Sequence, residues 1–450
     1  MKGEEQVLRF AQDDRRYDQE DRRYDVLVIG GGPAGIAAAA RGAECGRRVL
    51  LLDEGAETGG QIWRRRAGTH ARGTARAWFT RLEASGASVI RGASVVDVQL
   101  RPAGGFTVTA ERASGVLLVE AGALVVATGA RERFLPFPGW TLPGVIGVGA
   151  AQALLKSGAS FRGKRVVIAG SGPLLLPVAS ALRGDGASVR LVAEQAPSRA
   201  VARFAVGLVR HPGTLVQAAR HRAGFIGTPY PLGTWVTSAR GDESLEEVDI
   251  TDGRETRTVA CDLLCAAFGL VPNTEVARLL GCELTDGMVG VTAEQHTSVD
   301  GVYCAGEPTG IGGVEMSLAE GEIAGLCSAG RHTEARALFT RRDRLRAVAA
   351  AMNKAFALRE ELRSLARPDT IICRCEDVAF GTIDARWTMR QAKLYTRAGM
   401  GACQGRICGT ALEFLHGWKA DTTRLPVEPT LYSTLTAEPA TCAPPAKHGA

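Results

Sequence analysis

A strand, a glycine-rich turn and a helix near the start of the chain constrain the fold more than any other feature. Residues 25–29 form an apolar strand, and Gly30, Gly32 and Gly35 follow with the GxGxxG spacing. The first glycine allows a tight turn, the second lets a pyrophosphate approach the backbone, and the third lets helix and strand pack closely. Asp53 ends the next strand, where a carboxylate can accept hydrogen bonds from the ribose hydroxyls. The pattern predicts a Rossmann-type α/β unit with phosphates at the helix N-terminus.

A second strand–turn–helix–strand unit lies in the middle of the chain. Its turn contains Gly170 and Gly172, but Leu175 stands where the third glycine would be. Counting on with the spacing of the first unit leads to Ala193 instead of an acid, and the alternation of a strand can turn the adjacent Glu194 the other way. Two interpretations stay open: true NAD(P) binding, or a Rossmann domain kept for its architecture with weak or altered nucleotide affinity.

Four cysteines close to the C-terminal end indicate a metal module. Cys373 and Cys375 form a Cys-x-Cys pair, and Cys403 and Cys408 form a Cys-x4-Cys pair. A [2Fe-2S] cluster takes two thiolates on each iron, so we expect each sequence pair to serve one iron. Zinc knuckles prefer Cys-x2-4-Cys spacing, so the tight first pair favours iron–sulfur over zinc or scattered free cysteines.

Length, charge and cysteine content bound the class of protein. A chain of 450 residues predicts two or three domains. The net charge of +6 is modest and spread along the chain, which argues against a nucleic-acid surface. The first residues are charged and lack the apolar core of a secretory signal, and no apolar run reaches transmembrane length. We therefore expect a reducing, cytoplasmic location, free or peripheral at the inner face of the membrane.

Three further motifs complete a recognisable order: the sequence Gly-Gly-Gln at 59–61, a strand ending in Ala-Thr-Gly at 127–129, and a strand ending in Gly-Glu at 306–307. This order resembles the two-dinucleotide-binding-domain flavoproteins, the thioredoxin and glutathione reductase superfamily. In that family an inserted NAD(P)-type Rossmann domain splits the FAD domain. The resemblance implies an FAD site formed by Gly30, Gly32, Pro33, Ala34, Gly35, Asp53, Glu54, Gly60, Gln61, Ala127, Thr128, Gly129, Gly306 and Glu307, and a second nucleotide site at Gly170 and Gly172. Glu307 replaces the usual Asp.

The predicted organisation is α/β with two Rossmann-like domains and a small cysteine domain. The expected segments are a disordered arm (1–24), the first half of the FAD domain (25–145), the inserted NAD(P)-type domain (146–270), the second half of the FAD domain (271–333), a helical linker (334–364), the [2Fe-2S] domain (365–418) and a disordered tail (419–450).

A narrower resemblance rests on three motifs: 59–64 (GGQIWR), 136–145 (PFPGWTLPGV) and 396–408 (TRAGMGACQGRIC). Together they look like the FAD-containing A or alpha subunits of opine oxidases, of D-hydroxyproline and L-proline dehydrogenase complexes and of hydrogen cyanide synthase. The last motif resembles the bacterioferritin-associated-ferredoxin type of [2Fe-2S] domain, although that type usually has Cys-x2-Cys in its second pair. The match runs from about residue 25 to residue 418.

This resemblance implies an electron-transfer subunit of an amine or imino-acid dehydrogenase or oxidase complex. The implied partners are a beta subunit resembling D-amino-acid and sarcosine oxidases, together with a small ferredoxin-like protein. It also implies ATP as an alternative ligand of the second Rossmann domain. No Cys-x-x-Cys lies beside either nucleotide site, and no side-chain group indicates an acid–base catalyst. Two alternatives stay open: an NAD(P)H-dependent flavin reductase serving a ferredoxin-type partner, and a redox sensor without enzymatic activity.

Overall fold

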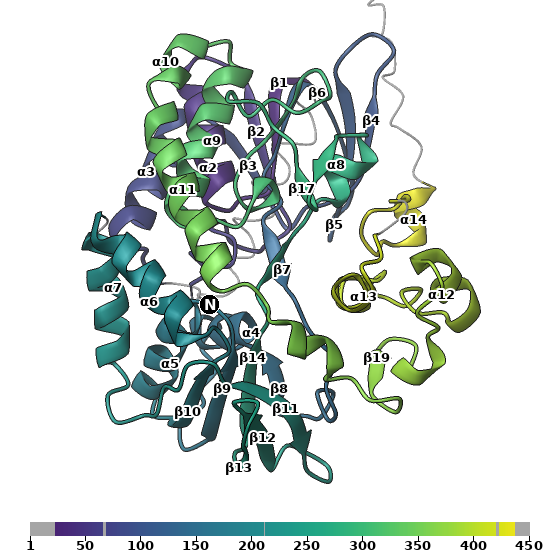
Figure 1. The fold of residues 1–450 in the computed structure, drawn as a ribbon. Coiled ribbons are helices and arrows are strands. Elements are labelled where there is room, and N and C mark those ends of the chain that lie inside the picture. The colour runs from purple at the N-terminus through teal and green to yellow at the C-terminus, as the bar shows by residue number, and fades with distance from the viewer. Residues whose placement is uncertain (1–22, 66–68, 211, 420–422, 437–450) are drawn as a thin grey trace, which may run out of the picture.

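The computed structural model describes residues 23–65, 69–210, 212–419 and 423–436. Two α/β lobes lie one above the other, and a smaller C-terminal module lies beside them (Figure 1). The expected arm 1–24 falls outside the described residues except at its end, where Arg23 and Tyr24 already belong to the first strand, β1 (Arg23–Ile29).

The first lobe is built on a seven-stranded sheet with strand order β3-β2-β1-β6-β5-β4, in which β18 also pairs with β6. The strands β1, β2, β3, β6 and β18 run parallel, and β4 and β5 are antiparallel additions. The bounds are β2 (Val49–Asp53), β3 (Ser88–Arg91), β4 (Ser94–Leu100), β5 (Phe106–Arg112), β6 (Gly115–Val126) and β18 (Val302–Cys304). The central strands β1 and β2 are nearly continuous apolar runs because helices cover both faces of a parallel sheet.

Two helices that are far apart in the sequence of this lobe pack closely on each other. Helix α2 (Pro33–Glu44) follows β1, and helix α9 (Val314–Ser328) follows β18. A Cβ on Gly321 would lie 2.1 Å from the carbonyl oxygen of Ala34, and one on Gly325 would lie 2.3 Å from that of Ala38. Only glycine permits this approach. The contact joins the two halves of the split domain, and α3 (Gly73–Ser85) packs beside α2.

The second lobe contains a parallel sheet of order β10-β9-β14-β8 and an antiparallel sheet of order β11-β12-β13. Its strands are β8 (Val145–Gly147), β9 (Arg165–Gly170), β10 (Ser188–Glu194), β11 (Trp235–Arg240), β12 (Glu247–Thr251), β13 (Thr256–Ala260) and β14 (Leu263–Ala267). Its helices are α4 (Val148–Ser157), α5 (Leu175–Gly184), α6 (Ser198–Gly207) and α7 (Pro212–Ala223).

The chain crosses between the lobes earlier than expected. The strands β7 (Ala130–Glu132) and β15 (Leu270–Pro272) pair with each other between the two lobes (Figure 1). Leu135, Phe137 and Trp140 then pack into the core of the second lobe, together with residues of its sheets. The predicted boundary at 146 is therefore late by about a dozen residues, because the apolar segment after β7 already belongs to the second core.

The helical linker and the cysteine module complete the fold. The linker region contains α10 (His332–Arg336), α11 (Phe339–Ala355) and a 3₁₀ turn at Glu360–Ser364, which agrees with the predicted helical segment. The module contains β19 (Ile371–Cys373), β20 (Val378–Ala379), α12 (Met389–Thr396) and α13 (Cys408–His416). Shorter elements of the first lobe are α8 (Glu275–Leu279), β16 (Leu284–Thr285) and β17 (Met288–Val289).

The expected disordered tail 419–450 is wrong for residues 423–436. Val427 is buried in the core of the first lobe and donates its N–H to the carbonyl of Val96 at 3.0 Å. The carboxylate of Glu111 accepts hydrogen bonds from Thr430, Leu431 and Thr434 before and within α14 (Tyr432–Leu435). Composition alone misses this segment, because its order depends on contacts with β4 and β5. Residues 420–422 and 437–450 lie outside the described residues.

Candidate functional site

The first glycine turn lies at the C-terminal edge of the first sheet, between β1 and α2. A Cβ on Gly30, which has φ +105°, would lie 2.3 Å from the carbonyl oxygen of Ala127, and a Cβ on Gly35 would lie 1.8 Å from that of Gly30. Pro33 occupies the first helical position, where its missing N–H costs nothing. These contacts fix the turn and direct the free amides of the helix N-terminus toward the sheet edge.

Three features of this edge fit the adenine dinucleotide of FAD. Among the described residues, a Cβ on Gly32 would meet nothing within 4 Å, so they leave the backbone there open. Oδ2 of Asp53 is buried without a hydrogen-bond partner in the part of the chain that the structure describes, and so is Oε2 of Glu307. Burial raises the pKa of Asp53, and burial raises the pKa of Glu307 to about 7. An open glycine backbone at the same edge as two unsatisfied carboxylates is the donor and acceptor set that a pyrophosphate and its ribose and ribityl hydroxyls require.

The other predicted FAD residues gather at the same edge, with two exceptions. A Cβ on Gly60 would lie 3.1 Å from the Cα of Gly32, so the Gly-Gly-Gln turn backs directly onto the glycine turn. Thr128 closes the end of β6 by donating its hydroxyl to the carbonyl of Asn273 at 2.6 Å. The side chains of Glu54 and Gln61 are exposed. Positions 30–35, 53, 60, 127–129 and 306–307 therefore lie together at one edge of the sheet, and Glu54 and Gln61 lie at its rim.

The sequence patterns missed a buried acid that supports this edge. Glu320 of α9 is fully buried and accepts a hydrogen bond from the N–H of Gly306 at 3.0 Å. Arg346 of α11 forms an ion pair with Glu320 at 2.7 Å, and Thr309 donates its hydroxyl to the same carboxylate. Glu320 thus fixes the turn that carries Glu307. Its position in the middle of an apolar helix was the only signal in the sequence.

The second glycine turn has the same frame as the first. A Cβ on Gly170 would lie 1.9 Å from the carbonyl oxygen of Ala267, as Gly30 meets Ala127. Glu194 lies opposite Gly170 in the pairing of β9 with β10. It ends β10 as Asp53 ends β2. Its carboxylate accepts hydrogen bonds from the N–H groups of Gly172 and Ala196, each at 2.8 Å.

The expectation that Glu194 points away, with Ala193 in the acid position, is wrong. The pairing of β10 with β9 shifts register between Val189 and Leu191, so β10 carries one extra residue. The bulge moves the acid from position 193 to position 194. Glu194 is fully buried, and this burial raises its pKa to about 7.

The second turn differs from the first at its helix. Helix α5 begins only at Leu175, whereas α2 begins at Pro33, directly after its second glycine. Leu175 is fully buried in the core of the lobe, where a third glycine was expected. Gly172 has φ +104°, and Gly32 has φ −74°. Counted from the second glycine of each turn, α5 therefore begins two residues later than α2, so its free amides lie farther from the glycines.

The chain itself covers the second turn. The hydroxyl of Ser171 donates to the carbonyl of Phe356 at 2.7 Å, and Gln195 donates to the carbonyl of Ala357 at 3.0 Å. Arg359 donates its N–H to Gln195 at 3.2 Å, and its guanidinium lies 3.7 Å from the ring centre of Trp235. We call residues 356–359 the covering segment. It follows α11 and lies over the sheet edge where a Rossmann domain binds its nucleotide.

The four C-terminal cysteines come together, and each direct thiol contact joins one cysteine of the first motif to one of the second. The side chains of Cys375 and Cys403 interact, and so do those of Cys373 and Cys408. A backbone N–H of Cys403 lowers the pKa of Cys375, but burial and the neighbouring thiols raise it further, so the net shift is upward. Burial, followed by Cys373, raises the pKa of Cys408. The direct thiol contacts thus run between the two motifs, and Cys373 also lies near Cys375, as Cys403 does near Cys408. That each motif serves one iron stays a prediction.

The backbone around these cysteines is unusual. Asp377, Arg397 and Gln404 have φ values of 50°, 65° and 50°, a region that non-glycine residues seldom occupy. A Cβ on Gly399 would lie 3.9 Å from Sγ of Cys408, and one on Gly401 would lie 2.2 Å from Cβ of Cys375. Strained residues persist where the surrounding structure holds them for a function. Two thiol pairs within glycine-rich loops, with a backbone N–H directed at one sulfur, fit a [2Fe-2S] cluster.

A polar chain of contacts joins the flavin edge to the cysteine module. Asn273 bonds to Thr128 through its carbonyl and its side chain, and its side-chain oxygen accepts from Arg131 at 2.6 Å. Arg131 also pairs with Glu275 at 2.9 Å and donates to the carbonyl of Arg406 at 3.4 Å. Arg406 lies two residues before Cys408. The contacts fix the cysteine module against the strand that ends at the flavin edge.

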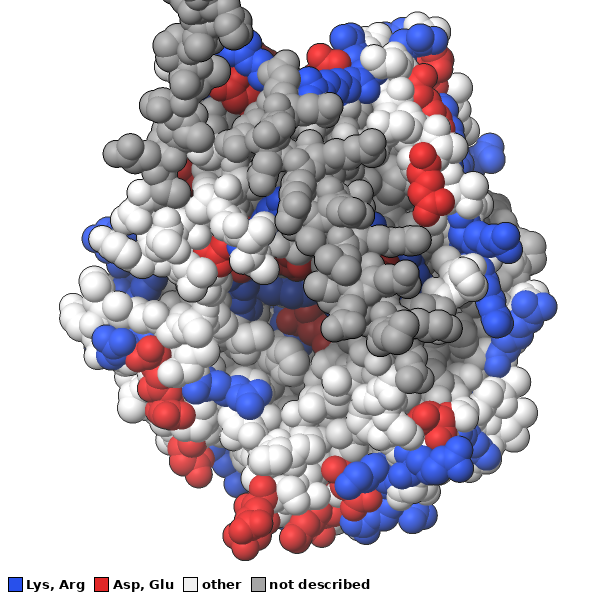
Figure 2. Space-filling view, turned by 180° about the vertical axis from the view of Figure 1, so that it is seen from behind, with Lys and Arg blue, Asp and Glu red and all other residues white. Residues whose placement is uncertain are grey.

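The surface offers no single-sign face on the side that Figure 2 shows. Among the described residues visible there, basic and acidic side chains are scattered over the same regions. In the part of the chain that the structure covers, no helix is both long and apolar enough to span a membrane.

Comparison with known proteins gives matches over most of the chain. The family model described as pyridine nucleotide-disulphide oxidoreductase matches residues 24–324. The HcnB component of hydrogen cyanide synthase from Pseudomonas aeruginosa is 33% identical, over 85% of this chain and 90% of that protein. The A component of opine oxidase from Rhizobium meliloti is 33% identical, over 87% of this chain and 92% of that protein. These matches confirm the resemblance predicted from the motifs.

Solved structures agree on the fold. L-proline dehydrogenase from P. horikoshii superposes with a TM-score of 0.66 and 19% identity, over 92% of this chain and 80% of that chain. The thioredoxin reductase of T. acidophilum superposes with a TM-score of 0.54 and 22% identity, over 69% of this chain and 99% of that chain. The two Rossmann-like lobes thus have the thioredoxin reductase arrangement.

Proposed function

Because the chain belongs to the pyridine nucleotide-disulphide oxidoreductase family, in the group of HcnB and the opine oxidase A component, we propose that it is the electron-transfer subunit of an amine or imino-acid dehydrogenase or oxidase complex. It is an FAD-dependent oxidoreductase by family. The proposal adds a [2Fe-2S] cluster on Cys373, Cys375, Cys403 and Cys408, and partner subunits that oxidise the substrate. When bound, the flavin would supply the step between two-electron and one-electron chemistry, and the cluster the one-electron exit.

The chain's own residues would hold and orient the flavin. The turn at Gly30–Gly35 and the helix N-terminus of α2 offer backbone amides to the pyrophosphate. Asp53 and Glu307 offer their unpaired buried oxygens to hydroxyl groups. Glu320 holds the N–H of Gly306, and with it the position of Glu307.

Two observations favour electron exit toward the C-terminal module. The sequence has no Cys-x-x-Cys beside the flavin edge, so the disulfide route of thioredoxin reductase is missing. A chain of contacts runs from Thr128 at the flavin edge through Asn273 and Arg131 to Arg406 of the module. This chain of contacts is the single observation that carries the relay proposal.

The partner assignment rests on the relatives. HcnB and the opine oxidase A component are subunits of larger enzymes by name, and the alpha subunit of sarcosine oxidase from Corynebacterium is 32% identical over 45% of this chain and 22% of that protein. We infer a beta subunit resembling D-amino-acid or sarcosine oxidases, which reads an opine, hydroxyproline, proline or similar amine. The covering segment argues against the alternative of an NAD(P)H-dependent flavin reductase, because it occupies the approach to the second turn.

The test is metal and flavin analysis of the anaerobically purified full chain. We expect about two iron and two acid-labile sulfide per chain. The Cys403→Ser variant should lose the visible cluster absorption and the reduced-state EPR signal but keep FAD, because the flavin edge belongs to another lobe. Cys45→Ser, which changes a partly exposed cysteine far from the module, is the matched control and should keep both. Stoichiometric zinc without iron in the unaltered chain would overturn the relay and leave a flavoprotein with a zinc module.

A further inference from the structure

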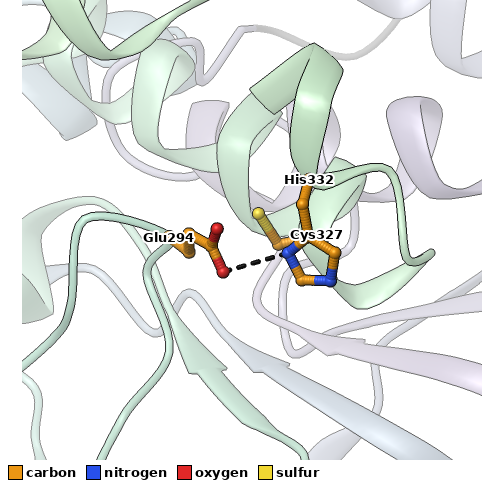
Figure 3. Close-up of side chains that lie close together, drawn as sticks. All are labelled: Glu294, Cys327 and His332. Atoms are coloured by element: carbon orange, nitrogen blue, oxygen red, sulfur yellow. Dashed lines mark hydrogen bonds and ion pairs between the residues drawn. The ribbon is translucent and has the colours of Figure 1, made fainter. Parts of the chain in front are cut away.

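Three side chains with metal-binding atoms converge on the outer side of the first lobe, away from the two glycine turns and the cysteine module. Glu294, Cys327 and His332 each present one ligand atom, and these atoms lie within 4.8 Å of one another (Figure 3). Nδ1 of His332 lies 2.9 Å from Oε2 of Glu294. The three residues come from the loop before β18, the end of α9 and the start of α10.

The turn after α9 brings His332 back over Cys327. Helix α9 ends at Ser328, and Gly330 then adopts φ +81°. The N–H of Arg331 donates to the carbonyl of Leu326 at 2.8 Å, which closes the turn. Cys327 is buried at 2% exposure, so its sulfur reaches the cluster from the core, whereas His332 reaches it from the surface. Both positions are set by the backbone.

The loop that carries Glu294 is fixed on both sides. The next residue, Gln295, is fully buried with φ +61° and accepts from Arg346 at 2.9 Å. The side-chain amide of Gln295 donates to the carbonyl of Cys304 at 3.1 Å. Before Glu294, the carbonyl of Ala293 accepts from Arg342 at 2.8 Å. A non-glycine residue held in the left-handed region by this many contacts keeps the carboxylate of Glu294 directed at the other two ligands.

We propose that Glu294, Cys327 and His332 bind a zinc ion, with a water molecule in the fourth position. A thiolate, an imidazole and a carboxylate form a mixed S, N, O set that suits Zn²⁺. Zinc–ligand bonds of about 2.0–2.3 Å in a tetrahedron require ligand atoms about 3–4 Å apart, so the observed cluster needs only a small contraction. The partly exposed Glu294 and His332 leave an entry path from solvent.

Metal binding would also change the protonation of the Cys327 thiol. Burial, followed by the charge of Glu294, raises the pKa of Cys327 to about 12, so the sulfur is protonated near neutral pH. Zinc would replace that thiol proton, which would be released to solvent. The bound ion would tie the loop before β18 to the end of α9. Because β18 leads into Gly306 and Glu307, the ion would stiffen the segment that carries one side of the flavin edge.

The experiment uses the full chain, purified anaerobically with its iron, equilibrated with zinc chloride and then gel-filtered. Zinc, iron and FAD are measured for the unaltered chain, for His332→Gln and for His296→Gln. His332 is 47% exposed at its side chain, so its replacement should leave the fold intact. His296 is the matched control, because it lies nearby, in edge-to-face contact with Tyr303 (ring centres 5.1 Å apart), but outside the cluster.

We expect His332→Gln to hold about one zinc fewer per chain than the other two proteins, with iron and FAD equal in all three. Zinc should also raise the melting temperature of the unaltered chain and of His296→Gln, but not that of His332→Gln. A cobalt difference spectrum should show a thiolate-to-cobalt band that Cys327→Ser lacks. Equal zinc in His332→Gln and the unaltered chain, or no zinc in either, would overturn the proposal and leave a surface ion pair beside a core cysteine.

Discussion

The first and second glycine turns share a frame and differ in what lies in front of it. In both, the first glycine packs against the carbonyl at the end of a neighbouring strand, and an acid ends the next strand. The carboxylate of Glu194 is occupied by two backbone N–H groups, whereas Asp53 keeps a buried oxygen without a partner. The described chain leaves the backbone at Gly32 open, whereas the covering segment lies over the second turn.

The difference shows that a glycine motif predicts the backbone of the strand, turn and helix. The contacts that the rest of the protein makes with this backbone decide what can bind. The first turn keeps its amides and one acid oxygen available for a ligand. In the second turn, the protein's own chain already bonds to the same groups. We therefore expect the first site to hold FAD and the second to bind nicotinamide nucleotides poorly.

The largest effect should come from placing the same side chain in each turn. At Gly32, whose φ of −74° suits any residue, valine would fill the open space that the pyrophosphate needs. Gly32→Val should therefore purify folded but with FAD reduced from about one per chain to background. Gly172→Val would strain a backbone at φ +104° and cost the second lobe about 1–3 kcal/mol, yet leave FAD bound. Flavin content and circular dichroism check both, and normal FAD in Gly32→Val would break the comparison.

The second effect concerns nicotinamide nucleotides. With the second turn covered, NADH or NADPH should reduce the flavin of the isolated chain far more slowly than the ordinary catalytic rate of about 10 per second. Stopped-flow absorbance follows the bleaching of the flavin. Reduction at ordinary catalytic rates would show that the covering segment does not block the site.

A smaller effect, on nucleotide affinity, should follow from releasing the covering segment. The Arg359→Ala variant removes the contact with Trp235 and the side-chain bond to the carbonyl of Gly233, and Phe356→Ala removes the contact with Phe204. Together they should release the covering segment and strengthen binding of ADP-ribose or ATP by about tenfold, or about 1.4 kcal/mol. Calorimetry measures the affinity. Arg363→Ala, which changes another arginine of the same linker, is the control, and an unchanged affinity in the double variant would assign the weakness to the late start of α5 instead.

The smallest effect is a dependence of the free energy of unfolding on pH, caused by the carboxyl group of Glu194. Its folded pKa of about 7 lies above the ordinary value of 4.5. A carboxyl that binds its proton more tightly in the folded state contributes stability below pH 4.5, and this contribution is lost as the pH rises toward and through 7. The free energy of unfolding should thus fall by about 2 kcal/mol between about pH 5 and pH 8, and Glu194→Gln should remove this part of the slope. Urea unfolding at several pH values measures it, and equal slopes in both proteins would contradict the burial argument.

The sequence predicts the backbone of the candidate site correctly where the relevant residues lie within one strand–turn–helix–strand unit. The strand, turn and helix around Gly30 and the acid at Asp53 follow within one unit, so the motif predicts the first edge well. The acid of the second unit was misplaced by one residue, because the bulge between Val189 and Leu191 leaves no mark in the pattern.

The remaining differences are non-local. The covering segment lies far along the chain from Ser171, and only folding brings the two together. Each cysteine of the first motif contacts a cysteine of the second, as Cys373 contacts Cys408, although the two motifs lie far apart in sequence. The order of residues 423–436 depends on contacts with Val96 and Glu111, which belong to strands near the start of the chain. Pattern and spacing contain no information on such contacts.

The central claim is that electrons which reach the flavin at the first site leave through the C-terminal module. A reductive titration of the anaerobically purified chain, followed by absorbance and EPR, tests it most directly. The account predicts uptake of about three electrons per chain, two by the flavin and one by the cluster, with a [2Fe-2S] signal that appears on reduction. Uptake of about two electrons, with a reduced flavin and no cluster signal, would contradict it.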